Sequence, residues 1–264
     1  MRLSIELVPR TAGDFATQLS AVAACAPDLV AHGFDTINVP DAPRYALHPV
    51  DACERVALRG WRGIPHLRSM DVAETAFDDL AERLLDARVR EVLVIAGDPP
   101  KQGRPRAPET TPQVLLRALG ARVSGLRCHA AFDPNRPPDA DTLARLDAKI
   151  AAGARGLFGQ PAFTEAAIET WARVLEPRLP ASSIWWGASP VVGDRARAWW
   201  ERVNDVRFPA HFEPTLADWH GRLPSLAAAA RAAGGNLYLM PIRTPVEATV
   251  APLRSVVASL PEIA

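Results

Sequence analysis

Three polar side chains stand at or just past the ends of apolar segments, where they could do acid–base or binding chemistry. Glu6 lies inside LSIELVP, Asp98 follows VLVIAG, and Gln160 lies in GLFGQPAF. A desolvated carboxylic acid has a pKa raised toward neutrality, which suits Glu6 to act as a general acid. Gly97 would let the backbone beside Asp98 come close to a ligand, and the Gln160 amide could donate to and accept from a planar heterocycle.

Each of these positions also has an ordinary structural interpretation. Glu6 could face solvent on an alternating strand, although strands of a parallel barrel rarely have a solvent face. Gly-Asp-Pro-Pro, residues 97–100, is a common turn composition, and Gln160 also lies beside Gly and Pro. A lone histidine such as His66, which ends GIPH, is more often structural than catalytic.

Short apolar runs alternate with longer segments of helical period, which is the pattern of strand–helix units around a parallel sheet. We expect eight strands, at Leu3–Val8, Thr36–Val39, Gly63–Leu67, Val92–Ala96, Leu126–Ala130, Gly156–Phe158, Ser183–Trp186 and Leu237–Met240. Eight such units in 264 residues predict one (β/α)8 TIM barrel over residues 1–264. An open doubly wound sheet has the same period and is the alternative.

Helical periodicity supports these units. Apolar residues repeat at helical spacing in three segments, after Asp71, before Gly153 and after Thr164, which is a plausible N-cap. Residues 100–112 are rich in Pro, Gly and Arg, and we expect a long loop there. In a barrel of this type the active site lies at the C-terminal ends of the strands, so the polar residues at those ends carry the functional hypothesis.

Composition narrows the class of partner. Thirty basic and thirty acidic residues cancel without a block of like charge, so we expect no nucleic-acid partner and a small-molecule ligand instead. Three widely spaced cysteines predict neither disulfides nor a thiolate metal site, and the sequence predicts no signal peptide, no membrane span and a cytoplasmic location. A homo-oligomer is possible. P-loop, GxGxxG and GxSxG motifs are absent.

Four segments taken in order are similar to one known family. They are SIELVP, IPHLRSMDVAETAFDDLAERLLDARVREVLVIAGDPP, KIAAGARGLFGQPAF and NDVRFPAHF. Over Ser4 to about Pro245 the chain resembles the methylenetetrahydrofolate reductase family, whose members are flavin-bearing (β/α)8 barrels. They reduce 5,10-methylenetetrahydrofolate to 5-methyltetrahydrofolate with electrons from a reduced nicotinamide.

The resemblance implies roles for individual residues. Glu6 would be the general acid that helps to open the imidazolidine ring, Asp98 would bind the pterin and tune the flavin, and Gln160 would hydrogen-bond the pterin. Trp200 would stack on the nicotinamide or folate, and Arg243 would contact the substrate. The implied FAD contacts are His66, Gly97, Phe132, Arg136 and Lys149, with NAD(P)H as the electron donor.

The chain departs from the family pattern on the flavin side. Ala96 stands where one branch has an arginine before Gly-Asp, NVPDAPRY replaces a Val-Thr segment, and Arg136 stands in place of a histidine. Arg44, Arg68 or Arg136 could supply the missing charge. Three functions therefore remain open: a flavin-dependent methylenetetrahydrofolate reductase, a one-carbon folate enzyme without tightly bound flavin that transfers a hydride or a methyl group, and a non-catalytic folate-binding protein.

Overall fold

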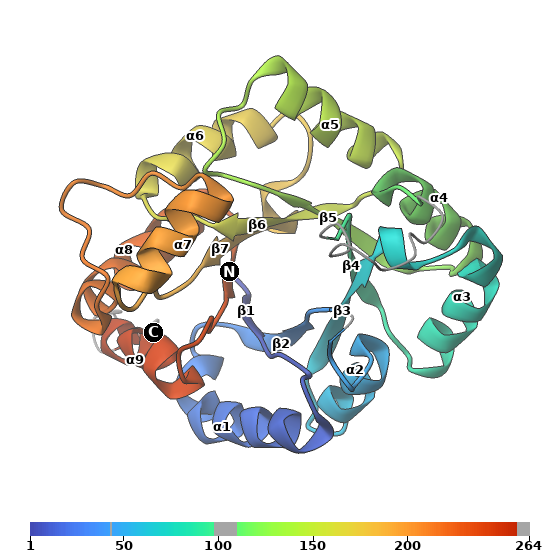
Figure 1. Ribbon diagram of the computed structural model, residues 1–264, viewed down its shortest axis with the longest axis horizontal. Helices are drawn as coiled ribbons and strands as arrows, with labels where there is room; N and C mark the ends of the chain where they lie inside the picture. Colours follow the sequence, from blue (N-terminus) through green and yellow to red (C-terminus); the bar gives the residue numbers. More distant parts are fainter. Residues whose placement is uncertain (43, 98–109, 258–264) are drawn as a thin grey trace, which may run out of the picture.

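Eight parallel strands form a closed barrel with helices around it (Figure 1). The computed structural model describes residues 1–42, 44–97 and 110–257. The strands β1 to β8 are Leu3–Glu6, Phe34–Val39, Arg62–Arg68, Glu91–Ile95, Arg127–Phe132, Gly156–Pro161, Ile184–Ala188 and Asn236–Leu239. Each overlaps a predicted strand. The (β/α)8 prediction is confirmed, and the open sheet is wrong because β1 pairs with β8 as well as with β2.

The α-helices follow the strands. Helices α1 to α9 are Ala12–Val30, Pro49–Ala57, Phe77–Asp86, Pro112–Arg122, Ala140–Ala151, Glu165–Leu175, Asp194–Asn204, Leu216–Ala232 and Val246–Val257. Short 3-10 turns occupy Ser69–Asp71, Glu74–Ala76 and Ala181–Ser183. Thr164 caps α6 as predicted, because its hydroxyl accepts a hydrogen bond from the Ala167 N–H.

Successive side chains of a strand point alternately toward the helices and into the barrel, which gives an outer and an inner apolar layer. Leu3 and Ile5 of β1 pack toward the helices, whereas Ser4 and Glu6 have the opposite orientation and point into the barrel. A separate apolar cluster fills the middle of the barrel. It consists of Ile64, Leu93, Phe158, Trp185, Tyr238 and Met240. The barrel interior is therefore a packed core below its mouth and not a pore.

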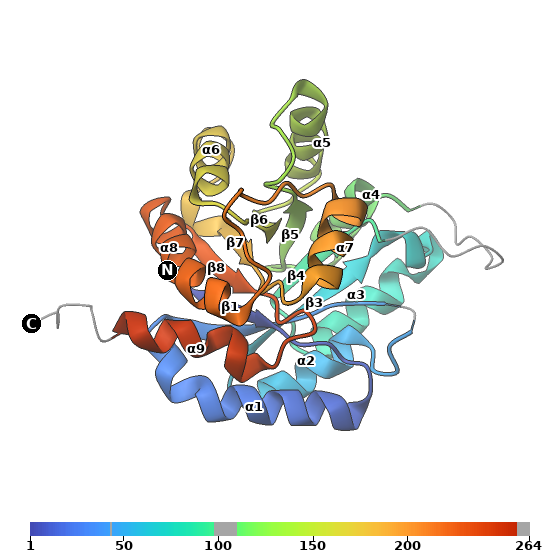
Figure 2. The ribbon, with the colours of Figure 1, turned by 60° about the vertical axis from the view of Figure 1, so that its left-hand side comes forward.

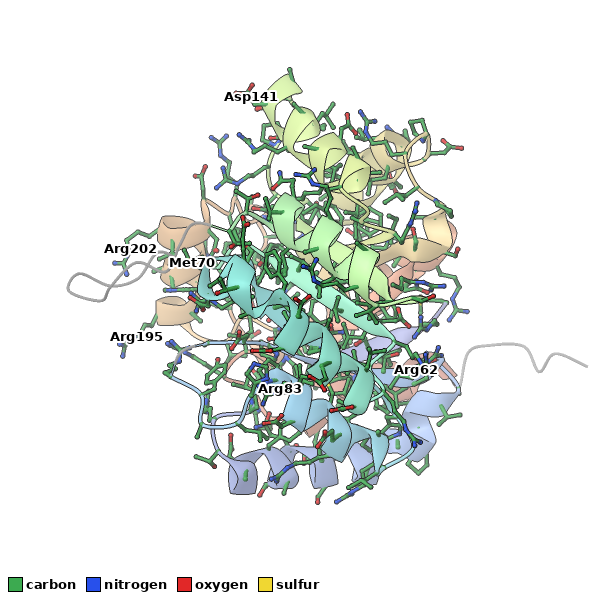
Figure 3. All side chains as sticks on the ribbon, turned by 90° about the vertical axis from the view of Figure 1, so that its right-hand side faces the viewer. Arg62, Met70, Arg83, Asp141, Arg195 and Arg202 are labelled. Carbon is green, nitrogen blue, oxygen red and sulfur yellow. The ribbon has the colours of Figure 1, made fainter. Side chains whose placement is uncertain are left out.

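The two ends of the barrel carry different elements (Figure 3). Arg62 begins β3 at one end, which we call the floor, and Met70 follows β3 at the other end, which we call the C-terminal mouth. Arg195 and Arg202 of α7 lie at the same end as Met70 and point away from the barrel.

Charged side chains close the floor. Arg2 forms ion pairs with Asp35 at 3.3 Å and with Glu91 at 3.4 Å, and His129 Nε2 donates to Glu91 at 2.8 Å. The Arg2 guanidinium also lies 4.8 Å from the ring centre of Trp185, a cation–π contact. These charged groups lie beneath the apolar cluster, at the end of the barrel opposite the C-terminal mouth.

An aromatic cluster forms one wall of the C-terminal mouth. It consists of Phe163, Val191, Trp200, Val206 and Phe212, with Phe208 and Ile242 packed against it. Ile242 also contacts the barrel interior cluster, so the wall and the core are continuous.

In the described ranges Cys25, Cys53 and Cys128 are all buried and none forms a disulfide. Within the same ranges no group of three potential metal ligands occurs, and no helix is long and apolar enough to cross a bilayer.

Candidate functional site

Glu6 and Tyr238 form a hydrogen-bonded pair at the C-terminal mouth. Glu6 ends β1, and the Tyr238 hydroxyl from β8 donates to its Oε2. Burial raises the pKa of Glu6 to about 7, although the Tyr238 hydrogen bond opposes this change by stabilising the carboxylate. Near neutral pH Glu6 therefore exchanges readily between acid and carboxylate, as a general acid must.

A second polar chain lies beside this pair. The Asn38 amide nitrogen from β2 donates to the Ser4 hydroxyl, and the Asn38 oxygen lies 3.1 Å from His66 Nε2. Since an amide oxygen only accepts, His66 Nε2 carries the proton and Nδ1 keeps its lone pair. Burial lowers the pKa of His66 to about 3, so the ring is neutral at physiological pH. His66 can thus accept a hydrogen bond but cannot act as a cationic acid.

Arg68, at the end of β3, brings a positive charge to the mouth. Its Nε lies 2.9 Å from Asp71 Oδ2. A side chain on Gly97 would approach Arg68 Nε to 2.7 Å, and Gly97 has a φ of +90°, so glycine lets the chain after β4 pass over this guanidinium. Ala96 leaves no charge at the end of β4, whereas the guanidinium of Arg68 lies beside Gly97. Asp98 lies outside the described residues.

Gln160 is exposed at the end of β6, where the strand is irregular. The β6–β7 register shifts between Phe158 and Pro161, on either side of Gln160. Such a bulge changes the direction of a side chain at the rim of a barrel. Strand β7 accommodates this register shift because residue 187 is a glycine. A Cβ on Gly187 would lie 2.7 Å from the Gln160 carbonyl oxygen and 2.3 Å from the Gly159 carbonyl oxygen.

Four predicted residues meet in one cavity beside the C-terminal mouth. Phe132, Arg136, Lys149 and Gln160 line a space of about 420 Å³, together with Arg145 and other side chains of α5 and α6. Helices α5 and α6 lie on the outer side of β5 and β6 (Figures 1 and 2). Sequence reasoning assigned the first three to a cofactor and Gln160 to a substrate, whereas the structure gives all four a common space.

The other predicted residues lie apart from this cavity. Trp200 is 3% exposed, because its ring packs against Phe163 and Trp199 in the aromatic wall. Its ring faces are therefore covered by protein, and Trp199 is the exposed member of that pair. Arg243 is exposed in the loop after β8 and has a φ of +57°, an unusual conformation for a residue with a side chain.

Sequence reasoning missed Tyr238, Asn38 and Ser4. A signal was present, since polar residues recur at alternate positions in otherwise apolar strands, as in Ser4 and Glu6. In a parallel barrel, such alternation marks the side chains that point inward. Arg145 was missed because it occupies an ordinary exposed position on a helix.

The barrel is similar to solved structures at low sequence identity. An uncharacterised protein from Clostridium thermocellum that binds two copies of 5-methyl-5,6,7,8-tetrahydrofolic acid matches with a TM-score of 0.59 and 10% identity, over 98% of this chain and 96% of that chain. A dihydropteroate synthetase solved with a product matches with a TM-score of 0.50 and 13% identity, over 98% and 93%. A 2,3-dimethylmalate lyase matches with a TM-score of 0.53 and 14% identity, over 97% and 77%.

These similarities show the TIM-barrel fold. No protein-family model matches the chain, and no curated protein matches its sequence. The methylenetetrahydrofolate reductase resemblance is therefore not supported by a family match.

Proposed function

We propose that this protein binds a reduced folate at the C-terminal mouth of its barrel and that Glu6 exchanges a proton with it. The observation that carries this proposal is the Glu6–Tyr238 pair, a carboxyl group with a pKa near 7 at the end of β1. Gln160 offers an exposed amide at the same end of the barrel. A pterin ring presents both donors and acceptors, which such groups can match.

One-carbon folates need a proton at the step that Glu6 would serve. When the bond between the bridging carbon and N10 of 5,10-methylenetetrahydrofolate breaks, its electron pair goes to N10 and a proton must follow. Protonated Glu6 would donate this proton and become a carboxylate, which the Tyr238 hydroxyl would stabilise. The carbon is left as an iminium on N5, ready to accept a hydride or another nucleophile.

Two of the structural similarities support a folate as the ligand class. One neighbour binds 5-methyltetrahydrofolic acid, and another is a dihydropteroate synthetase. Both share the barrel over almost the whole of this chain. We extend the ligand class of these barrels to this protein as part of the proposal.

The narrower hypothesis of an FAD-dependent reductase is less well supported by the geometry. His66 is 5% exposed and bound to Asn38, which leaves this side chain little surface for contact with a flavin. We therefore favour a one-carbon folate protein without tightly bound flavin, and treat reduction of methylenetetrahydrofolate by NAD(P)H with FAD as a separate hypothesis to be tested.

Calorimetric titration with tetrahydrofolate and 5-methyltetrahydrofolate tests the binding proposal. We expect micromolar or tighter binding to the wild type, with Gln160→Ala weakening it by about tenfold through loss of its hydrogen bonds to the pterin. Glu54→Gln, on the exposed face of α2, is the control and should bind like the wild type. If neither folate binds, the proposal is wrong.

The reaction is tested with 5,10-methylenetetrahydrofolate and NADH or NADPH, with and without added FAD. Turnover by colourless protein, lost in Glu6→Gln with folate binding retained, supports direct hydride transfer. Turnover that requires FAD, or a yellow protein as purified, supports the reductase hypothesis. Folate binding without turnover, and unchanged by Glu6→Gln, would contradict the role of Glu6 and favour a binding protein.

A further inference from the structure

The cavity beside the C-terminal mouth carries more positive than negative charge. Arg136, Arg145 and Lys149 line it, and Asp133 is the acidic residue on its wall. Asp133 pairs with Arg136 at 3.4 Å. Asp139 lies near both arginines, but its carboxylate caps α5 by accepting from the Thr142 N–H at 2.8 Å. Asp133 thus offsets the charge of Arg136, and the charges of Arg145 and Lys149 are left to meet an anionic group that enters the cavity.

Lys149 and Arg145 contact neutral oxygens in the described part of the chain. Lys149 Nζ donates to the Ala131 carbonyl at 2.7 Å, and Arg145 Nη2 donates to the Thr142 hydroxyl at 3.4 Å. Burial lowers the pKa of Lys149, and the charge of Arg145 lowers it further. The two cations thus repel each other across a partly buried space, and an anion between them would relieve this repulsion.

The cationic side chains are spaced along one face of α5. Thr142, Arg145 and Lys149 occupy positions i, i+3 and i+7, which share a helix face over about 10 Å of its length. Phe132 and Trp171 also line the cavity and give it an apolar part. The cavity therefore suits a ligand that carries an aromatic or apolar part and then several anionic groups in series.

Gln160 connects this cavity to the C-terminal mouth. Gln160 lines the cavity and lies at the exposed end of β6, and Ala131 both lines the cavity and packs on the barrel interior cluster. A ligand seated over Glu6 could therefore extend across the ends of β6 and β5 into the cavity.

We propose that this cavity binds the glutamate tail of the folate, with its carboxylates on Arg145, Lys149 and Arg136 and its aminobenzoyl ring on the apolar part of the cavity. The inference rests on the proposed function, because it requires the pterin to occupy the mouth. A tail of several glutamates distributes its carboxylates along a chain, as the cations are distributed over the loop before α5, which holds Arg136, and over α5, which holds Arg145 and Lys149, whereas a diphosphate concentrates its charge.

Titrations with ligands of graded tail length test the inference. The ligands are 6-methyltetrahydropterin, which has no tail, and the mono- and triglutamate forms of 5-methyltetrahydrofolate. For the wild type we expect the triglutamate to bind about tenfold more tightly than the monoglutamate, with an advantage that shrinks between 50 and 200 mM salt. Arg145→Ala should reduce that advantage by several-fold and leave 6-methyltetrahydropterin binding unchanged.

Matched variants separate local charge from general effects. Arg173→Ala removes an exposed arginine of α6 that does not line the cavity, and it should keep the triglutamate advantage. Arg145→Gln repeats the test with a side chain of similar length, and thermal unfolding checks that each variant is folded. Arg145 is exposed, so its removal should leave the fold intact.

The outcomes distinguish this inference from the proposed function. Equal affinity for all tail lengths, with Arg145→Ala without effect, overturns the tail site while leaving folate binding intact. Failure of every pterin and folate to bind overturns the proposed function itself. Binding of ADP or FAD that is lost in Arg145→Ala, with the tail lengths still equal, assigns the cavity to a dinucleotide and also overturns the inference.

Discussion

The Tyr238 hydroxyl donates a hydrogen bond to the Glu6 carboxylate, joining the last strand of the barrel to the first. The two residues are 232 positions apart in the chain. Their contact therefore forms only when β8 pairs with β1 and the barrel closes. The group proposed to exchange a proton is thus positioned by the same pairing that completes the fold.

Tyr238→Phe should raise the pKa of Glu6 above its value of about 7. The hydroxyl stabilises the carboxylate, so its removal favours the protonated form by about 1 kcal/mol, or roughly one pKa unit. Titration of the Glu6 carboxyl carbon by NMR measures this directly. Tyr45→Phe, at the other tyrosine of the chain, is the control and should leave the Glu6 titration unchanged. A lower pKa in Tyr238→Phe would contradict the assigned hydrogen bond.

Glu6→Gln should change how stability depends on pH. The pKa of Glu6 is raised from 4.5 to about 7 in the folded protein, so its stabilising contribution is complete below pH 4.5 and is lost as pH rises through 7. The stability lost amounts to about 3 kcal/mol, and Glu6→Gln does not lose it because glutamine does not ionise. In urea unfolding at pH 5 and pH 8, the free energy of unfolding of Glu6→Gln relative to that of the wild type should be higher at pH 8. The same free-energy difference at both pH values would show that Glu6 titrates normally.

Asn38→Leu should allow the ring proton of His66 to occupy Nδ1 as well as Nε2. The substitution leaves His66 and Ser4 without their shared amide, at a cost of about 1–3 kcal/mol. Nitrogen NMR of the imidazole reports the tautomer, and we expect pure Nε2–H in the wild type and a mixture in Asn38→Leu. If the variant keeps the single Nε2–H form, a group other than Asn38 determines the tautomer of His66.

Gly187→Ala should disturb the bulge at Gln160. The added methyl group would lie 2.3 Å from the Gly159 carbonyl oxygen, so β6 must shift, at a cost of about 1–3 kcal/mol. We expect lower thermal stability and weaker folate binding. Gly221→Ala in α8 has nothing within 4 Å of its added methyl group and should stabilise the protein slightly. If Gly187→Ala keeps full folate affinity, the Gln160 geometry is not needed for binding.

The fold could be predicted from local pattern because the strands are short apolar runs in a regular series. The end of β6 was placed too early, at Phe158 instead of Pro161, since Gly159 and Gln160 do not continue the apolar run. The strand nevertheless extends through them as a bulge. A bulge depends on its neighbouring strand, here Gly187, and single-segment patterns do not show it.

The site was predictable only where one residue carries the signal. Glu6 and Gln160 stood out because a polar side chain interrupts an apolar segment. Tyr238, which donates to Glu6, and Asn38, which contacts Ser4 and His66, come from strands far away in the sequence, so no single segment shows these contacts. The charge of the cavity was likewise hidden, because Arg145 looks like any exposed helical arginine until α5 is placed beside β5.

The ion-paired floor has a consequence for the proposed function. Arg2, Glu91 and His129 lie at the end of the barrel opposite Glu6, and the packed interior cluster lies between them and Glu6. If two compounds react over Glu6, both would have to approach it from the C-terminal side of the barrel. A compound that binds first against Glu6 would then be covered by the second, which favours an ordered addition of the two.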